Sequence, residues 1–381
     1  MSFLDGLETP HAYVDLERVR RNLERVHRYA KSHGISLRPH TKTHKDDRIG
    51  RMQMAAGADG LTVATAKEAE VMANATTNLL VAYPAVDRAR IERLLALPAA
   101  VELTIALDSA ESIERIRAAA AASRRVVRIL VELDLGGRRT GIATPDELVR
   151  LARLALSPWT EFAGVLYHPG QLRAHVIDPS LRNAFSPEIS EQKDAEEFAR
   201  FSEHQRALRA DLSRHLESLE RHDIPCPIVS GGNTPSLFFN HLVPELTEIR
   251  PGTYVYSDRD IASQGILPWD ACAYGVVATV VSTAVSGQAV VDAGTKSLAK
   301  EPIAGLVGLG ALVDHPEIHL KSLSEEHGIL DTSGSSYAPR VGDRVRIVPN
   351  HVCVSVHLQD RIAFLDGDHG EVRDVPARGR A

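Results

Sequence analysis

The sequence predicts a parallel (β/α)8 TIM barrel followed by an antiparallel β domain. Up to about residue 256, short segments rich in β-branched and apolar residues alternate with Ala-, Leu-, Arg- and Glu-rich segments that have helical spacing. Beyond residue 256, segments with strand character follow one another across Gly, Pro, Asn and Asp turns, without a long helical period. Strands that alternate with helices are typical of a parallel sheet, and eight of them favour a closed barrel over an open sheet.

The eight barrel strands are predicted at residues 36–43, 60–65, 78–84, 101–108, 126–134, 162–168, 226–232 and 247–256. Helical spacing is clearest in the segments 16–32, 66–73, 110–122 and 187–220. The last connection, 233–248, is short and predicts only a weak helix. We expect the barrel to occupy residues 15–258.

The antiparallel β domain is predicted from strands at residues 274–283, 288–292, 343–349 and 361–366. We expect this domain to comprise residues 259–381 together with the N-terminal segment 1–14.

Composition excludes several classes of protein. The chain has 381 residues, of which 44% are apolar and 25% charged, and its net charge is −6, with no basic stripe of the kind that binds nucleic acid. No apolar run approaches the ~20 residues that a membrane span needs, and the N-terminus does not resemble a signal peptide. The three scattered cysteines, Cys226, Cys272 and Cys353, indicate a reducing compartment. We therefore expect a cytoplasmic enzyme.

The segment Arg-Pro-His-Thr-Lys-Thr-His-Lys, residues 38–45, ends the first predicted strand. Active sites of TIM barrels lie at the carboxyl ends of the strands. A lysine at such a place, Lys42, either finds a partner or loses its charge, and a lysine with a lowered pKa is a Schiff-base nucleophile. From spacing alone, a solvated basic loop is equally compatible with this segment.

Glycine-rich loops follow three other strands. Asp-Leu-Gly-Gly-Arg-Arg-Thr-Gly at 134–141 combines a flexible turn with cations that suit an anionic ligand. Residues 230–236 and 250–253 follow the seventh and eighth strands, where barrels commonly bind phosphate through backbone N–H groups. Each loop could be an ordinary glycine turn, but their joint position favours a phosphorylated cofactor.

His351 and Cys353 form a candidate metal pair in the β domain. In an extended segment, residues two apart point to the same side, so that both side chains could bind one ion. Imidazole and thiolate favour zinc over magnesium or calcium. A structural His-x-Cys is an open alternative, but two protein ligands would leave positions for substrate, as in a catalytic site.

Taken together, these motifs resemble the alanine-racemase-like, fold type III enzymes that use pyridoxal 5′-phosphate (PLP). Within them the chain is similar to the metal-activated D-threonine aldolases, D-serine dehydratases and D-threo-3-hydroxyaspartate dehydratases. The resemblance covers nearly the full length, through motifs at residues 9–10, 38–45, 137–142, 230–236, 250–258, 290–297, 325–329 and 349–353.

The resemblance implies a role for individual residues. Lys42 corresponds to the lysine that binds the cofactor covalently, and Arg139 to an arginine that contacts its phenolic oxygen. His168 or His175 corresponds to the proposed base, and His351 with Cys353 to the ligands of a zinc or manganese ion. The resemblance implies that the other cofactor-binding residues are Tyr167, Gly232, Asn233, Thr234, Arg250, Gly252, Thr253 and Tyr254.

The implied substrate is a small D-3-hydroxyamino acid, and the resemblance implies two possible outcomes. Retro-aldol cleavage would give glycine and an aldehyde, as in a D-threonine aldolase, which we favour. Elimination would give a 2-oxo acid and ammonia, as in the dehydratases, whose His-x-Cys pair this chain shares where many aldolases have His-x-Asp. An amino-acid racemase or a non-catalytic PLP-binding protein is a more distant alternative. The resemblance also implies a homodimer.

Five further residues are expected to have simpler roles. We expect His44 and Lys45 at the surface or in a supporting position. His327 could either line the metal site or belong to a turn, and Cys226 and Cys272 are interpreted as apolar fillers.

Overall fold

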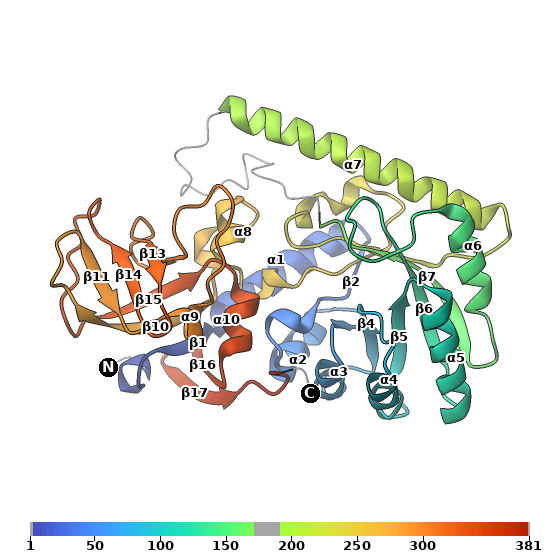
Figure 1. Ribbon diagram of the computed structural model, residues 1–381, viewed down its shortest axis with the longest axis horizontal. Coiled ribbons are helices and arrows are strands. Elements are labelled where there is room, and N and C mark those ends of the chain that lie inside the picture. Colours follow the sequence, from blue (N-terminus) through green and yellow to red (C-terminus); the bar gives the residue numbers. More distant parts are fainter. Residues whose placement is uncertain (1–2, 171–190, 380–381) are drawn as a thin grey trace.

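The computed structural model describes residues 3–170 and 191–379, and of residues 191–202 it describes the backbone only. Two parts lie side by side in Figure 1, a barrel formed by residues up to about 256 and a β domain that includes the N-terminal strand. No helix among the described residues is long and apolar enough to cross a membrane.

The barrel consists of eight parallel strands in the order β2-β9-β8-β7-β6-β5-β4-β3. The two edges of this sheet meet where His40 pairs with Thr62, whose N–H donates to the Pro39 carbonyl at 2.8 Å. All eight predicted barrel strands are confirmed. Their bounds are β2 Ser36–Leu37, β3 Leu61–Val63, β4 Asn78–Val81, β5 Glu102–Leu107, β6 Val127–Leu133, β7 Thr160–Tyr167, β8 Ile228–Gly231 and β9 Glu248–Ile249.

The first and last barrel strands are much shorter than predicted. Each ends just before an Arg-Pro pair, at Pro39 and Pro251, and proline has no N–H to donate to a strand ladder. The chain then makes a single turn of 3₁₀ helix in each place, η2 at Thr41–Thr43 and η4 at Thr253–Val255. The last residues of the two predicted strands, 41–43 and 253–255, therefore lie on tight turns above the barrel.

Helices surround the barrel, and most begin at a side-chain cap. Asp15, Asp46, Thr65, Asp87, Ser109 and Thr144 each accept a hydrogen bond from the first turn of α1 to α6 in that order. The bounds are α1 Leu16–Ser32, α2 Asp47–Ala55, α3 Ala66–Met72, α4 Arg88–Leu95, α5 Ala110–Ser123, α6 Pro145–Leu154 and α7 Glu191–Glu220. The weak helix expected at 233–248 is a 3₁₀ helix, η3, at Leu237–Leu242.

Side chains of the barrel strands alternate between the interior and the surrounding helices. Leu80 belongs to a small apolar cluster that fills the interior, whereas its neighbours Leu79 and Val81 pack in the main core under the helices. The interior cluster consists of Leu80, Ala106, Leu130, Ala163 and Leu166. The barrel is therefore a packed core, and a ligand can bind only above it.

The β domain is one mainly antiparallel sheet system built on β10 and β15. The N-terminal strand β1 joins it, antiparallel to β10 and parallel to β16. The four predicted strands are confirmed as β10 Tyr274–Ser282, β11 Gln288–Val291, β15 Arg344–Pro349 and β16 Arg361–Asp366. Five others were not predicted: β1 His11–Asp15, β12 Gly310–Leu312, β13 Leu320–Leu323, β14 Gly328–Asp331 and β17 His369–Asp374.

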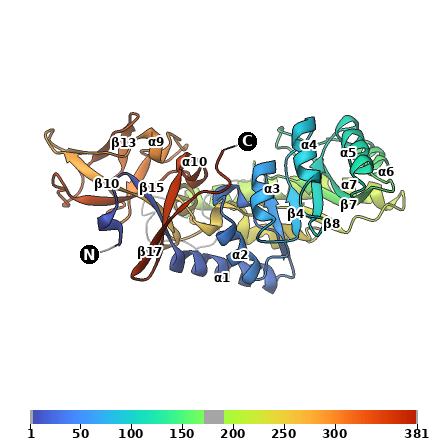
Figure 2. The same ribbon diagram turned by 90° about the horizontal axis from the view of Figure 1, so that it is seen from below.

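Two short helices, α8 Arg259–Ser263 and η5 Trp269–Ala271, connect the barrel to the β domain in the chain. Two more, α9 Thr295–Leu298 and α10 Val352–Leu358, lie between strands of the β domain. Figure 2, seen from below, shows α10 facing the barrel, with the C-terminal end of the chain nearby. There the N–H of Ala377 donates to the carbonyl of Lys45 at 3.0 Å, so that the chain after β17 holds the loop that carries Lys42.

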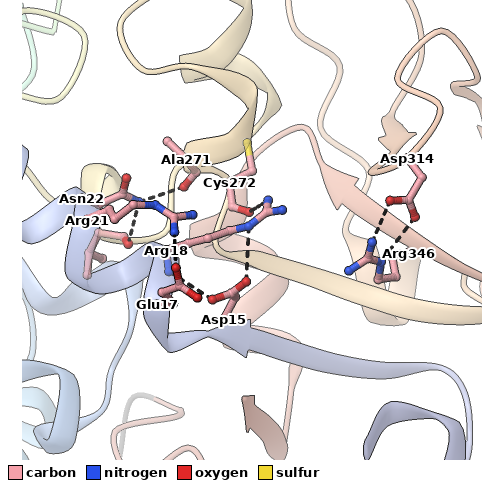
Figure 3. Close-up of polar contacts among 10 residues, drawn as sticks. Asp15, Glu17, Arg18, Arg21, Asn22, Ala271, Cys272, Asp314 and Arg346 are labelled. Carbon is pink, nitrogen blue, oxygen red and sulfur yellow. Dashed lines mark hydrogen bonds and ion pairs between the residues drawn. The ribbon is translucent and has the colours of Figure 1, made fainter. Parts of the chain in front are cut away.

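Helix α1 connects the two parts through polar contacts, which Figure 3 shows. The buried amide of Asn22 donates to the carbonyls of Ala271 at 2.8 Å and Val255 at 3.2 Å. One turn earlier, Arg18 donates to the carbonyl of Cys272 at 3.0 Å. Side chains of this one helix therefore donate hydrogen bonds to backbone carbonyls of the segment that leads from the barrel to the β domain.

Asn22→Leu is expected to lower the free energy of unfolding by about 1–3 kcal/mol, because it leaves two buried carbonyls without their donor. Urea denaturation of both proteins measures this difference. Arg21→Ala is the control, since Arg21 makes only an exposed pair with Glu17 on the same helix. Equal losses in the two variants would contradict the role given to Asn22.

Candidate active site

A cavity of about 570 Å³ lies at the carboxyl ends of the barrel strands. Residues of α8 and the start of α10 also line it. The turns after β2, β8 and β9, the loop after β6 and the residues 351 and 353 all line it. A larger groove of about 950 Å³ lies between α1 and α2, but none of the predicted site residues lines it. The volume of a cavity therefore does not identify the candidate active site. The side chains that line the smaller cavity identify it.

Lys42 lines the cavity from η2 rather than from a strand. The ring of His40 accepts a hydrogen bond from the Lys42 backbone N–H at 3.4 Å and caps this turn. His40 itself lines the cavity and is a site residue that the sequence analysis did not single out, although it lies within the same motif. The turn holds the backbone and leaves the lysine side chain facing the cavity.

Two cavity histidines are held in the neutral form. Burial, together with the positive charges of Arg139, Arg250 and Lys42, lowers the pKa of His168 to about 3. Burial and the charge of Lys42 also place the pKa of His40 well below its ordinary value. A neutral imidazole has a free lone pair, so His168 can accept a hydrogen bond from a ligand in the cavity.

The loops after β8 and β9 form a cradle lined with glycine. Gly232 has φ +72°, and a Cβ there would lie 2.8 Å from Asn240 Oδ1. At Gly252 a Cβ would lie 3.0 Å from the carbonyl oxygen of His40. Thr234 Oγ1 is buried at this cradle and has no hydrogen-bond partner among the described residues. A donor without a partner beside close-packed backbone fits a bound phosphate.

Two arginines supply positive charge to the cavity. Arg250 is buried and donates to Ser230 Oγ at 2.6 Å and to the Tyr167 carbonyl at 2.8 Å, and burial lowers its pKa to about 10. Arg139 is more exposed and lies 3.5 Å from the buried carboxylate of Glu132. Glu132 also accepts a hydrogen bond from Thr140 at 2.8 Å. The sequence analysis missed Glu132, although a charged residue within an apolar strand was a visible signal.

Two expected cofactor contacts do not reach the cavity through their side chains. Leu166 and His168 line it, so the alternation along β7 turns Tyr167 the other way, against Gly231. Tyr254 is fully buried, and its hydroxyl accepts a hydrogen bond from Gln53 at 3.3 Å. Gly232, Asn233, Thr234, Gly252 and Thr253 all line the cavity, whereas His175 lies outside the described residues.

His351 and Cys353 meet at the cavity, but not through the extended segment expected from the sequence. His351 has extended backbone and is the N-cap of α10, whereas Cys353 lies in the first turn of that helix. Both side chains nevertheless line the same cavity, where Cys353 Sγ lies 3.2 Å from Thr43 Oγ1. The expectation of a strand was wrong because a distant residue, Asp258, accepts a hydrogen bond from the Val352 N–H at 3.1 Å and so supports the start of the helix.

The pair combines two side-chain types that can bind a metal ion. Burial alone would raise the pKa of the Cys353 thiol, but the charge of His351, its hydrogen bond and the charge of Lys42 outweigh burial, and the pKa is lowered. Conversely, burial opposes but the neighbouring Cys353 and Asp258 raise the pKa of His351. A thiol that ionises readily next to an imidazole fits zinc. Among the described residues, no group of three or more His, Cys, Asp or Glu side chains is arranged to hold an ion.

Of the two positions expected for His44 and Lys45, the surface is excluded and the supporting position is the one observed. His44 is fully buried and its ring lies 3.2 Å from Gln53 Oε1 and accepts from the Asp46 N–H. Lys45 forms a buried ion pair with Glu68 at 2.5 Å. Both support the Lys42 turn from below. His327, in contrast, is exposed and does not line the cavity.

Burial lowers the pKa of His44 to about 3, which makes stability depend on pH. The unfolded chain binds a proton at this residue below about pH 6.5 and the folded protein does not, so stability is present above that pH and is lost as the pH falls toward 3. His44→Gln is expected to flatten this dependence by up to about 1.4 kcal/mol per pH unit, measured by urea denaturation between pH 7.5 and 5. A variant at the exposed His369 is the control. If the free energy of unfolding of His44→Gln depends on pH as steeply as that of this control, the role given to His44 is contradicted.

The fold is a barrel with an attached β domain, and a lysine, a glycine-lined cradle and a His-Cys pair share one cavity. The family model for the alanine racemase N-terminal domain matches residues 14–260, and that for a putative serine dehydratase domain matches residues 273–365. The chain belongs to this alanine-racemase-like, fold type III family.

Three comparisons place the chain more closely within the family. It is 30% identical over 368 residues to the D-threo-3-hydroxyaspartate dehydratase of Delftia sp. strain HT23, covering 92% of each chain. The crystal structure of D-threonine aldolase from Filomicrobium marinum has a TM-score of 0.85 and 30% identity, over 98% of this chain and 96% of that one. A cysteine-to-alanine mutant of the dehydratase, described as in the metal-free form, has a TM-score of 0.83 and 28% identity over 100% of both chains.

Proposed function

We propose that this protein is a PLP- and divalent-metal-dependent lyase that acts on D-3-hydroxyamino acids, with D-threonine aldolase activity as the first candidate. One observation carries the proposal: Lys42, the phosphate cradle and the His351–Cys353 pair line the same cavity. The relatives with similar length and fold are named as an aldolase and a dehydratase, both of which are lyases.

The described residues can hold both groups. Gly232, Gly252 and Thr234 fit the phosphate of PLP, Lys42 its aldehyde, and Arg139 its phenolic oxygen. When bound, PLP withdraws electrons from the α-carbon of an attached amino acid, and a divalent metal polarises a hydroxyl oxygen. The name of the metal-free cysteine mutant of the dehydratase supports a metal held by Cys353.

Two residues of the chain could each accept a proton from the substrate, and the reaction outcome depends on which of them does so. His168 is our candidate to accept the proton of the substrate hydroxyl as the bond between the α- and β-carbons breaks. The β-carbon then leaves as an aldehyde, and return of a proton to the α-carbon gives glycine. If Lys42 Nζ takes the α-proton instead, the hydroxyl takes up a proton and leaves as water. The released enamine tautomerises to an imine, which a water molecule hydrolyses to a 2-oxo acid and ammonia. Arg250 is buried and lines the cavity, so its positive charge can stabilise negative charge on a bound ligand.

Dehydratase activity is the second candidate, favoured by Cys353 and by the 30% identity to a dehydratase. Product analysis separates the two. Purified protein with PLP and zinc or manganese is incubated with D-threonine, and L-threonine is the control. Glycine with acetaldehyde supports the aldolase, and 2-oxobutanoate with ammonia supports the dehydratase. No turnover of any D-3-hydroxyamino acid, without a change in cofactor absorbance, would refute the proposal.

We also propose that the protein is a homodimer, as the family resemblance implies. Sedimentation equilibrium of the PLP-loaded protein tests this, and a mass of one chain, 41.5 kDa, would contradict it.

A further inference from the structure

Asp258 ends the motif of residues 250–258 and has no role in the proposed function so far. Its side chain is fully buried, in contact with two helices that begin at different places in the chain. Oδ1 accepts a hydrogen bond from the Ile261 N–H at 3.0 Å and caps α8. Oδ2 accepts from the Val352 N–H at 3.1 Å and lies 3.1 Å from His351 Nδ1.

This contact fixes the protonation pattern of the His351 ring. An ionised carboxylate can only accept hydrogen bonds, so Nδ1 must carry a hydrogen to bond with Oδ2. In a neutral imidazole the lone pair then lies on Nε2, the nitrogen that remains for a ligand. Among the described residues, Asp258 makes no ion pair with a lysine or an arginine, so its buried charge is directed at His351 and at backbone N–H groups.

The same carboxylate also positions the second member of the metal pair. His351 is the N-cap of α10, yet its own side chain does not cap the helix. Asp258 replaces that cap by binding the N–H of Val352, the residue between His351 and Cys353. The imidazole and the backbone that carries the thiol are therefore held by one oxygen atom. Through Oδ1, Asp258 also holds α8, whose Ile261 lines the cavity.

We propose that Asp258 is the positioning residue of the metal pair: it orients His351 so that Nε2 faces the ion, and it sets the distance from His351 to Cys353. This inference rests on the metal site of the proposed function. Residues that support metal ligands in this way typically change metal affinity by about 10–100-fold when they are replaced. Asp258 itself is not expected to bind the ion.

Two variants keep the cap of α8 and remove the contact with His351. Asp258→Asn keeps the size, and its Oδ1 can still cap α8, but its amide presents hydrogens to His351 Nδ1 and so favours the opposite ring tautomer, with the hydrogen on Nε2. Asp258→Ser keeps a short acceptor for the α8 cap but is too short to reach His351. Asp15→Asn is the control, because Asp15 caps α1 through the Arg18 N–H at 3.0 Å and does not line the cavity.

The measurement is the zinc dissociation constant of the PLP-loaded proteins, obtained by competition with a chromophoric chelator. Cofactor absorbance and the thermal midpoint report whether each protein is folded and loaded. We expect zinc binding about 10–100-fold weaker in the two Asp258 variants and unchanged in Asp15→Asn, with normal cofactor absorbance in all of them. A folded Asp258 variant that binds zinc as tightly as the wild type would overturn the inference and leave the proposed function intact. Wild-type protein that binds no zinc would overturn the metal site itself, and this inference with it.

Discussion

Lys42→Ala is expected to reduce turnover by roughly 10²–10⁴-fold and to remove covalent attachment of the cofactor. Lys42 is the one lysine among the described residues that lines the cavity, and its Nζ is the group that can both bind an aldehyde and move a proton there. Reduction with borohydride followed by peptide mapping locates the attached cofactor in the wild type. We expect it on the peptide that contains Lys42.

Lys45 provides the matched comparison, since it lies three residues away but is buried against Glu68. Lys45→Met leaves that carboxylate buried without its partner, which costs about 3–5 kcal/mol of stability. The covalent attachment of the cofactor is expected to persist in this variant. Cofactor mapped to Lys45, or normal turnover by Lys42→Ala, would contradict the assignment of Lys42.

His351→Ala is the second large change. It is expected to lower kcat/KM by more than the roughly 10–100-fold that follows loss of a residue supporting a metal ligand, because it removes one of the two side chains that we propose as ligands. Added zinc is expected not to restore activity, whereas cofactor absorbance stays normal, since His351 is not part of the phosphate cradle. Activity that stays at the wild-type level after chelation would show that the pair is structural.

Cys353→Asp refines the same prediction. A carboxylate is a harder ligand than a thiolate, so the metal preference of the site is expected to shift from zinc toward manganese. The variant also creates the His-x-Asp pattern of many aldolases, and we expect its ratio of aldehyde to 2-oxo acid to rise. The ratio of the two products from D-threonine measures this effect. An unchanged ratio with either metal would show that the cysteine does not decide the outcome.

Local patterns in the sequence were sufficient to predict the barrel but not the turns above it. Eight apolar segments separated by helical periods identify every barrel strand, because that alternation is imposed by burial. The strand ends at Pro39 and Pro251 could have been predicted from the missing proline N–H. Likewise, the period of two along β7 places Tyr167 opposite to His168, which lines the cavity.

Other features depend on contacts between residues far apart in the sequence. The segment from Val352 to Val356 is rich in β-branched residues and locally favours a strand, yet it is helical. Asp258, distant in the chain, supports that helix and orients His351, and no local pattern shows this contact. The burial of His44 is similar, because it depends on how α2 and the β domain enclose the turn that carries Lys42.

The central claim is that one cavity holds the cofactor on Lys42 and a metal on the His351–Cys353 pair. A crystal structure of the protein loaded with PLP and zinc, with anomalous data at the zinc edge, tests it most directly. The account predicts continuous electron density from Lys42 Nζ to the cofactor, and a zinc peak bonded to His351 Nε2 and Cys353 Sγ. A cofactor bound outside this cavity, or zinc on other residues, would contradict it.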